Sequence, residues 1–165
     1  MTIPYRGETG HGTYFITASA YMKKNLLQSE RMADLFIELL YSYREQQKYL
    51  LHEFVVMPNH FHLLMSPIVT LERAMQFIKG GFSFQAKKRF GVTYEIWQTS
   101  FYDHRVRDAE EYEQFRRYIH ENPVRRGLVE RAEDWPFGSA NPKFQKDEVP
   151  QRLKPVDVLA ARMQA

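Results

Sequence analysis

The spacing of hydrophobic and polar residues along this chain predicts strands and helices in an intermixed order. Several segments are rich in β-branched and aromatic side chains, which is typical of strands. These segments are 12–20, 49–57, 60–66, 94–98 and 101–107. Only Pro58 and Asn59 separate the second segment from the third, and a two-residue link with turn residues predicts an antiparallel hairpin.

Apolar residues at helical spacing predict two helices in the first half of the chain. One runs from about Ser29 to Gln46 and has one apolar face. The other follows Thr70, whose hydroxyl can cap it, and runs towards Phe90. Glycines at 80 and 81 interrupt this second helix, at a cost of about 1 kcal/mol each relative to alanine. A kink or a close backbone approach would explain them.

A third helix is expected to begin at Asp108 and to end at Asn122. Pro123 sets this end, because a proline disfavours helical dihedral angles in the residue before it. Strands, a hairpin and helices in this order predict an α+β fold, an antiparallel sheet with helices packed against it. We expect one domain over residues 1–141, followed by a polar tail over 142–165 that can form a short helix from Val156 to Met163.

The composition bounds the class of protein. The chain has 165 residues, and 44% of them are hydrophobic, which is enough to bury a core. It has no cysteine, which excludes disulfides and thiolate metal sites and fits a reducing cytosol. No apolar stretch is long enough to span a membrane, and the N-terminus lacks a signal pattern. We therefore expect a soluble, cytoplasmic protein without a membrane partner.

The basic residues are clustered, which is a mild indication of a polyanionic partner. The net charge is +3 and the isoelectric point is about 9.1. Solvated surface charge is the alternative interpretation. The clusters are Lys87, Lys88 and Arg89, then Arg105 and Arg107, then Arg116 and Arg117, and finally Arg125 and Arg126.

The stretch MPNHFHLLMSP (57–67) carries the most specific candidate chemistry. Side chains alternate along a strand, so His60 and His62 share one face while Phe61 and Leu63 point into the core. Two imidazoles at this spacing can bind one metal ion. A pair of histidines that is hydrogen-bonded or exposed is the commoner alternative.

The third helix offers further candidates. Tyr118 and Asn122 are four residues apart, so they lie on one face of the helix at the edge of its apolar stripe. A metal ion used in phosphoryl transfer needs an oxygen ligand besides two imidazoles, and Asn122 can supply it. The simpler alternatives are a tyrosine that only packs and an asparagine that only ends a helix.

Four motifs together resemble one family. MPNHFHLLMSP, IWQTSFYDHRVR, YIHENPVRRGLV and DWPFGSA occur in this order and at this spacing in the REP-associated tyrosine transposases. These proteins are relatives of the single-strand transposases of small insertion sequences and belong to the HUH endonucleases. The resemblance covers roughly residues 12–141. It implies an antiparallel sheet flanked by helices, akin to the ferredoxin-like, RNA-recognition fold.

The resemblance also implies roles for individual residues. His60 and His62 would be the metal-binding pair, Tyr118 the catalytic nucleophile and Asn122 the third ligand to Mg²⁺ or Mn²⁺. Mobile relatives usually have glutamine at position 122, and WPFGSA has Phe137 where the family often has tryptophan. No general base is assigned, and His104 and His120 are the candidates.

The implied activity is cleavage and rejoining of single-stranded or hairpin DNA through a 5′-phosphotyrosine. The target would be a repetitive extragenic palindrome (REP), bound by the chain as a monomer or homodimer. The DNA-binding candidates are Lys87, Lys88, Arg89, Arg105, Arg107, Arg117, Arg125 and Arg126. The alternatives are a non-catalytic nucleic-acid-binding module on the same fold, a zinc hydrolase that uses the two histidines, and a plasmid nickase.

Overall fold

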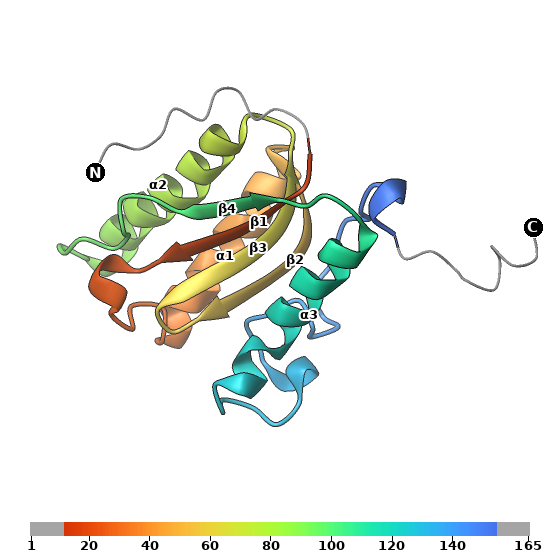
Figure 1. The fold of residues 1–165 in the computed structure, drawn as a ribbon. Coiled ribbons are helices and arrows are strands. Elements are labelled where there is room, and N and C mark those ends of the chain that lie inside the picture. The colour runs from red at the N-terminus through yellow and green to blue at the C-terminus, as the bar shows by residue number, and fades with distance from the viewer. Residues whose placement is uncertain (1–11, 155–165) are drawn as a thin grey trace, which may run out of the picture.

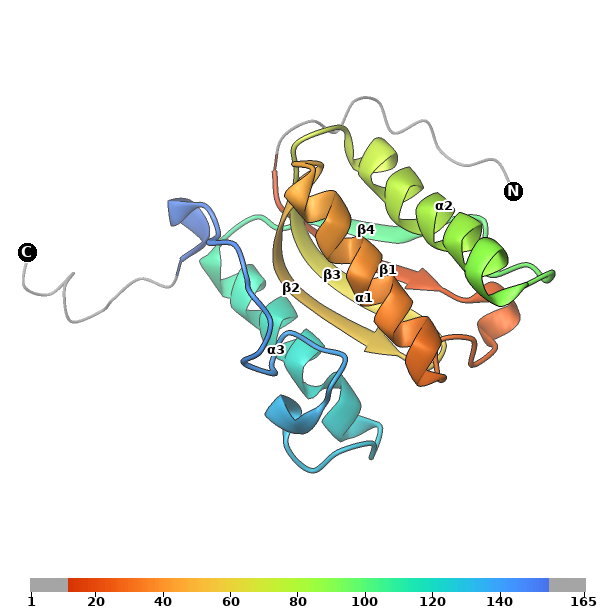
Figure 2. The ribbon, with the colours of Figure 1, turned by 180° about the vertical axis from the view of Figure 1, so that it is seen from behind.

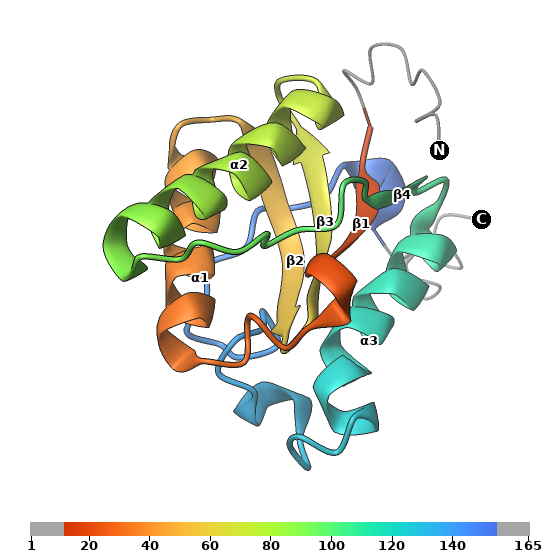
Figure 3. The ribbon, with the colours of Figure 1, turned by 90° about the vertical axis from the view of Figure 1, so that its left-hand side faces the viewer.

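A computed structural model describes residues 12–154 of the chain. These residues form three layers, which the side view separates clearly (Figure 3). Helices α1 (Glu30–Glu45) and α2 (Leu71–Phe90) cover one face of a sheet, and helix α3 (Ala109–Arg125) lies on the other face. The α+β class with an antiparallel sheet flanked by helices is therefore confirmed.

The sheet has four antiparallel strands in the order β2-β3-β1-β4 (Figure 1). Their bounds are β1 Tyr14–Ser19, β2 Tyr49–Met57, β3 His60–Pro67 and β4 Tyr102–Arg105. The hairpin β2–β3 turns at Pro58 and Asn59, as the sequence predicts. The hairpin places β3 beside β1, so the histidine-bearing strand lies inside the sheet and not at its edge.

The main apolar core lies between the sheet and helices α1 and α2 (Figure 2). Phe61, Leu63 and Met65 of β3 all point into it. The Thr70 hydroxyl accepts a hydrogen bond from the Arg73 amide and caps α2. The core is filled without the histidines, which leaves the other face of β3 available for polar residues.

The glycine pair in α2 is explained by a close approach at one of the two positions. A Cβ on Gly81 would lie 1.9 Å from the hydroxyl oxygen of Tyr43 in α1. A Cβ on Gly80 would meet nothing within 4 Å. Gly81 therefore allows the two helices to pack closely, whereas the structure gives no packing reason for Gly80.

Helix α3 does not end at Asn122, and the sequence prediction is wrong at this point. The helix passes through Pro123 and ends at Arg125. Proline removes the one backbone donor that would reach the Ile119 carbonyl, and the helix continues for only two residues beyond it, so little helix depends on the lost hydrogen bond. The Pro123 ring is buried, and the Arg126 amide still donates to the Asn122 carbonyl at 3.1 Å. The backbone carbonyl of Asn122 is therefore already hydrogen-bonded, and it is not one of the free carbonyls at a helix end that could attract a cation.

A β-bulge in β2 reverses the inward and outward alternation of that strand. Leu51 pairs with Met65 and Glu53 pairs with the adjacent Leu64, so His52 is the extra residue. Before the bulge, odd-numbered residues such as Leu51 face α1 and α2, and after it Val55 faces α3. The bulge therefore places the carboxylate of Glu53 on the side of α3, where it contacts that helix.

One further strand prediction is wrong. Residues 94–98 form no strand, since only Trp97 makes an isolated bridge, to Ala20 at the end of β1. Their apolar residues enter the core instead, and Ile96 and Trp97 are buried there. Within residues 12–154, no helix is both long and apolar enough to cross a membrane.

The C-terminal segment packs against the outer edge of the sheet. The backbone amide of Ser139 donates to the Phe54 carbonyl at 2.9 Å, and the amide of Asp147 donates to the Leu51 carbonyl at 2.8 Å. Asp147 also forms an ion pair with Arg44 of α1 at 2.8 Å. Residues 139–147 thus cover the exposed side of β2. The helix expected from Val156 to Met163 lies outside the described residues.

Candidate active site

His60 and His62 project from the same face of β3, towards α3. Their ring centroids are 4.8 Å apart, and both side chains are buried. This face is opposite to that of Phe61, as strand alternation predicts. The structure thus brings the two imidazoles together, within reach of one common ligand.

Each imidazole is oriented by a neighbouring oxygen at Nδ1. The Asn59 side-chain oxygen accepts a hydrogen bond from His60 Nδ1 at 2.6 Å, and the Thr17 hydroxyl lies 2.8 Å from His62 Nδ1. A neutral imidazole that donates from Nδ1 keeps its lone pair on Nε2. The Asn59 oxygen therefore leaves Nε2 of His60 available as a ligand, and Nε2 of His62 is available in the same way when its Nδ1 donates to the Thr17 hydroxyl.

The surroundings of the pair keep both imidazoles neutral. Burial, together with the positive charge of Arg126, lowers the pKa of His60 to about 4. Burial likewise lowers the pKa of His62 to about 3, with additional repulsion from His60 and Arg125. Since only a neutral imidazole binds a metal ion, both side chains are ready to do so at neutral pH.

Tyr118 of α3 lies directly against this pair. Its ring makes an edge contact with His62, with centroids 5.2 Å apart, and another with Phe15 at 6.0 Å. The tyrosine is 42% exposed, so the hydroxyl-bearing ring is held by packing and still open to solvent. The guanidinium of Arg125 lies 4.3 Å from the centroid of the Tyr118 ring and donates to the Tyr118 carbonyl at 3.1 Å.

Asn122 lies one helical turn beyond Tyr118 and is buried. Its Oδ1 atom and the Nε2 atom of His62 have no hydrogen-bond partner within residues 12–154. Leaving such a buried atom unpaired costs about 1–3 kcal/mol, so each is expected to have a ligand. Both atoms offer lone pairs, which is the chemistry that a divalent cation requires.

The donors at this site are two imidazoles and an amide. No group of three His, Asp or Glu side chains that could hold a metal ion is found in the described part of the chain. A zinc hydrolase usually has such a third ligand. The donor set thus fits a hard cation that keeps water or substrate oxygens in its remaining positions.

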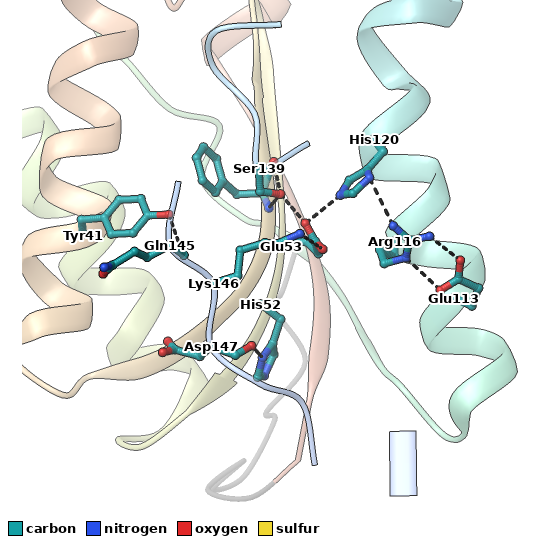
Figure 4. A network of polar contacts seen from close by, with 11 residues as sticks. Tyr41, His52, Glu53, Glu113, Arg116, His120, Ser139, Gln145, Lys146 and Asp147 are labelled. Atoms are coloured by element: carbon teal, nitrogen blue, oxygen red, sulfur yellow. Dashed lines mark hydrogen bonds and ion pairs between the residues drawn. The ribbon is translucent and has the colours of Figure 1, made fainter. Parts of the chain in front are cut away.

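A buried ionic network holds α3 against β2 (Figure 4). The carboxylate of Glu53 accepts from His120 at 2.7 Å and from Lys146 at 2.9 Å, and Ser139 also donates to it. Burial alone would raise the pKa of Glu53, but these donors outweigh it and the pKa is lowered. The network connects β2, α3 and the C-terminal segment, so it fixes the helix that carries Tyr118.

The two general-base candidates are both paired with carboxylates. His120 binds Glu53 through Nε2, and its Nδ1 lies 3.3 Å from a guanidinium nitrogen of Arg116. His104 contacts Glu111 through Nε2 at 2.7 Å. His120 therefore serves to position α3, and His104 remains a candidate only.

The predicted DNA-binding residues lie in different places. Arg125 and Arg126 lie beside the histidine pair, where their charges act on its pKa values. The cluster Lys87–Arg89 ends α2 on the opposite side of the sheet. Three further arginines are exposed on β4, on the connection to α3 and on α3 itself. They are Arg105, Arg107 and Arg117.

Sequence reasoning missed the residues that orient the histidines. Asn59 is recognisable only as a turn residue, although an asparagine directly before a histidine can contact its Nδ1 atom. Thr17 gives no sequence signal, because its role depends on the register that pairs it with His62. The aromatic residues that surround Tyr118 also come from separate strands and helices and could not be assembled from spacing.

The sequence model of the family "Transposase IS200 like" matches residues 11–122. This range includes both histidines, Tyr118 and Asn122. The match covers the sheet and all three helices up to the last turn of α3.

Individual relatives agree with this match. The chain is 27% identical over 150 residues to a "REP-associated tyrosine transposase" of Escherichia coli (strain K12), covering 88% of this chain and 84% of that protein. A solved structure described as a REP-associated tyrosine transposase bound to a REP hairpin superposes with a TM-score of 0.70. That alignment covers 95% of this chain and 96% of the other, at 22% identity, and supports the fold. The resemblance inferred from the four motifs is thus confirmed.

Proposed function

The chain belongs to the IS200-like transposase family, and we propose that it cleaves and rejoins single-stranded DNA beside a hairpin through Tyr118. The observation that carries this proposal is the contact between Tyr118 and His62, whose buried Nε2 atom has no hydrogen-bond partner among residues 12–154. A nucleophile beside two imidazoles that can bind a metal ion suits phosphoryl transfer and has no evident purpose in a module that only binds DNA.

The metal site consists of His60, His62 and Asn122. A bound Mg²⁺ or Mn²⁺ supplies charge that orients the scissile phosphate and stabilises negative charge on its oxygens. Thr17 and Asn59 contact the Nδ1 atoms of the imidazoles, so the Nε2 atoms are the ones left to bind the ion. The buried positions keep the histidines neutral, so protons do not compete for them near neutral pH.

Tyr118 performs the bond exchange. Its phenolic oxygen attacks the phosphorus and forms a P–O bond, while the bond from phosphorus to the 3′ oxygen of the preceding nucleotide breaks. The phenolic proton leaves to solvent or to a base, and the departing 3′ oxygen takes up a proton. The products are a 5′-phosphotyrosine and a free 3′-hydroxyl. One phosphodiester replaces another, so the reverse step can rejoin strands.

Helix α3 and its arginines position the nucleophile and the strand. The ionic network on Glu53 fixes the helix, and Arg125 lies against the Tyr118 ring where it can contact a phosphate. The relative whose structure contains a REP hairpin supports hairpin DNA as the substrate. Whether one or two copies of the chain bind it stays a prediction.

The test is a covalent adduct assay with a REP hairpin that carries single-stranded flanks, in the presence of Mn²⁺. The native chain should form a denaturant-resistant protein–DNA adduct, and peptide mapping should place the phosphotyrosine on Tyr118. Tyr118→Phe keeps the ring and its packing and removes only the attacking oxygen. This variant should bind the hairpin with unchanged affinity and form no adduct.

Two control variants remove a phenolic hydroxyl elsewhere. Tyr112→Phe changes the buried tyrosine of the same helix, and Tyr94→Phe changes an exposed tyrosine away from it. Both should form the adduct as the native chain does. An adduct that survives in Tyr118→Phe would exclude this residue as nucleophile. Tight hairpin binding by the native chain with no adduct under any divalent metal would support the non-catalytic module instead.

A further inference from the structure

A pocket of about 480 Å³ opens beside Tyr118, between the sheet and α3. Its volume is in the range of sites that bind small organic groups, about 300–1,000 Å³. The pocket shares His62 and Tyr118 with the candidate active site, and none of the described residues that line it is acidic. The lining residues are Phe15, Thr17, His62, Tyr102, Gln114, Phe115 and Tyr118.

Aromatic rings from three elements form most of this pocket. Phe15 of β1 and Phe115 of α3 are stacked, with centroids 4.3 Å apart and planes 12° apart. The rings of Tyr102 and Tyr118 stand at 70° and 86° to the Phe15 ring. Tyr102 is 56% exposed, so a face of its ring is available to a ligand. Flat aromatic groups can therefore stack in this pocket.

Two polar groups border the aromatic surface. Gln114 lies one helical turn before Tyr118 and is exposed, and its amide makes no hydrogen bond to another of the residues 12–154. Thr17 contributes its hydroxyl from β1. A glutamine amide can both donate to and accept from the edge of a nucleobase. The pocket thus combines surfaces for stacking with a group that can read a base edge.

A second pocket of about 380 Å³ continues from the first. The two share Thr17 and Tyr102, and the second is lined in addition by Ser19, Gln98, Ser100 and Phe101. Its hydroxyl and amide groups suit a sugar–phosphate backbone more than a base. Tyr102 thus lines both an aromatic pocket and a more polar one, and both pockets are bordered by strand β1.

We propose that the aromatic pocket binds one unstacked base of the DNA strand, from a nucleotide adjoining the phosphate that Tyr118 attacks. The inference rests on the proposed function, since it takes single-stranded DNA as the ligand. Tyr118 and His62 form part of the pocket wall, so a base inside it must belong to a nucleotide next to the reacting phosphate. Stacking on Tyr102 and Phe115 holds the base, and Gln114 contacts its edge.

The test is a scan of the single-stranded flank of a REP hairpin with one abasic nucleotide at a time. Equilibrium binding is measured without divalent metal, so that no cleavage occurs, and a mixed-sequence single strand serves as a second probe. At one position the missing base should weaken binding by the native chain roughly 5- to 150-fold, the range for one stacked base. In Tyr102→Ala the intact DNA should bind more weakly, and the abasic substitution at that position should have little further effect.

Matched variants separate the ring from its hydroxyl and from general surface effects. Tyr102→Phe keeps the ring and should respond to the abasic nucleotide as the native chain does. Tyr94→Ala removes another exposed tyrosine and should also leave the response unchanged. Gln114→Ala should reduce the difference in affinity among the four bases at the responsive position. An unchanged difference would overturn the role of Gln114.

The proposal is overturned if no flank position responds in either probe, or if the abasic penalty is the same in Tyr102→Ala as in the native chain. The adduct assay with Mn²⁺, run in parallel, tests the proposed function separately. Adduct formation without the Tyr102 response would leave the transposase chemistry intact and remove the base pocket. The Tyr102 response without an adduct would keep the pocket and remove the strand-transfer activity.

Discussion

The buried histidine pair should make the stability of the chain unusually sensitive to mild acid. An unfolded histidine has a pKa near 6.5, whereas the folded values are about 4 for His60 and about 3 for His62. Between these values the unfolded chain binds more protons than the folded chain. The free energy of unfolding therefore falls as the pH drops below about 6.5.

The size of this effect follows from the same pKa values. Each extra proton on the unfolded chain changes the free energy of unfolding by about 1.4 kcal/mol per pH unit. From about pH 7 to about pH 5 this amounts to roughly 2 kcal/mol for each histidine, or about 4 kcal/mol for the pair. That is a large fraction of the stability of an ordinary domain, about 5–15 kcal/mol.

Urea unfolding at about pH 7 and about pH 5, with a metal chelator present, measures this loss. The comparison variant is His60→Asn combined with His62→Asn, because the asparagine amide can still donate to the oxygens of Asn59 and Thr17. All other titrating groups, including the buried His52, are common to both proteins and cancel in the difference. The native chain should lose about 4 kcal/mol more than the variant between the two pH values. Equal losses would refute the neutral, buried state of the pair.

Three further predictions follow from other parts of the structure. Mn²⁺ should raise the midpoint of thermal unfolding of the native chain and leave that of the double histidine variant unchanged, because only a folded metal site gains from the ion. In hairpin-binding titrations, alanine at Arg125 and Arg126 should reduce the slope of log affinity against log salt concentration by about 0.7 for each phosphate that is no longer neutralised. Alanine at Lys87–Arg89, on the other face of the sheet, should reduce this slope less. A larger effect at Lys87–Arg89 would place the DNA on that other face. Gly80→Ala should stabilise α2 by up to about 1 kcal/mol in urea unfolding, whereas Gly81→Ala should forgo this gain because its Cβ displaces a tyrosine ring.

The parts of the site that the sequence predicts correctly depend on local geometry. Alternation along β3 is enough to place His60 and His62 on one face and Phe61 on the other. The helical repeat is enough to align Tyr118 with Asn122. The histidine pair of β3 and the Tyr118–Asn122 pair of α3 meet between the sheet and that helix. This meeting could be inferred only from the family resemblance, because contact between β3 and α3 depends on tertiary packing.

The places where the structure departs from local rules have a different physical origin. Simple alternation puts Glu53 on the same face as Leu51, and only the bulge at His52 turns it towards His120. A bulge leaves little trace in a sequence, because it adds a residue without requiring a particular type. Pro123 is a strong local signal, yet its burial outweighs the preference to end α3 before it. In each case a tertiary contact overrides a local rule.

The main core and the candidate active site lie on opposite faces of the sheet, so substitutions can change one during evolution without disrupting the other. Most of the buried apolar side chains lie between the sheet and helices α1 and α2, whereas the histidines, Tyr118 and the aromatic pocket lie on the α3 side with a smaller apolar cluster. Substitutions on the α3 side can remove the proposed nucleophile or a proposed metal ligand without opening the main core. A lineage that loses strand transfer in this way would keep a folded protein with its arginines in place. Such a descendant would compete with active copies for the same hairpins, which gives a direct route from a mobile-element enzyme to a resident DNA-binding protein.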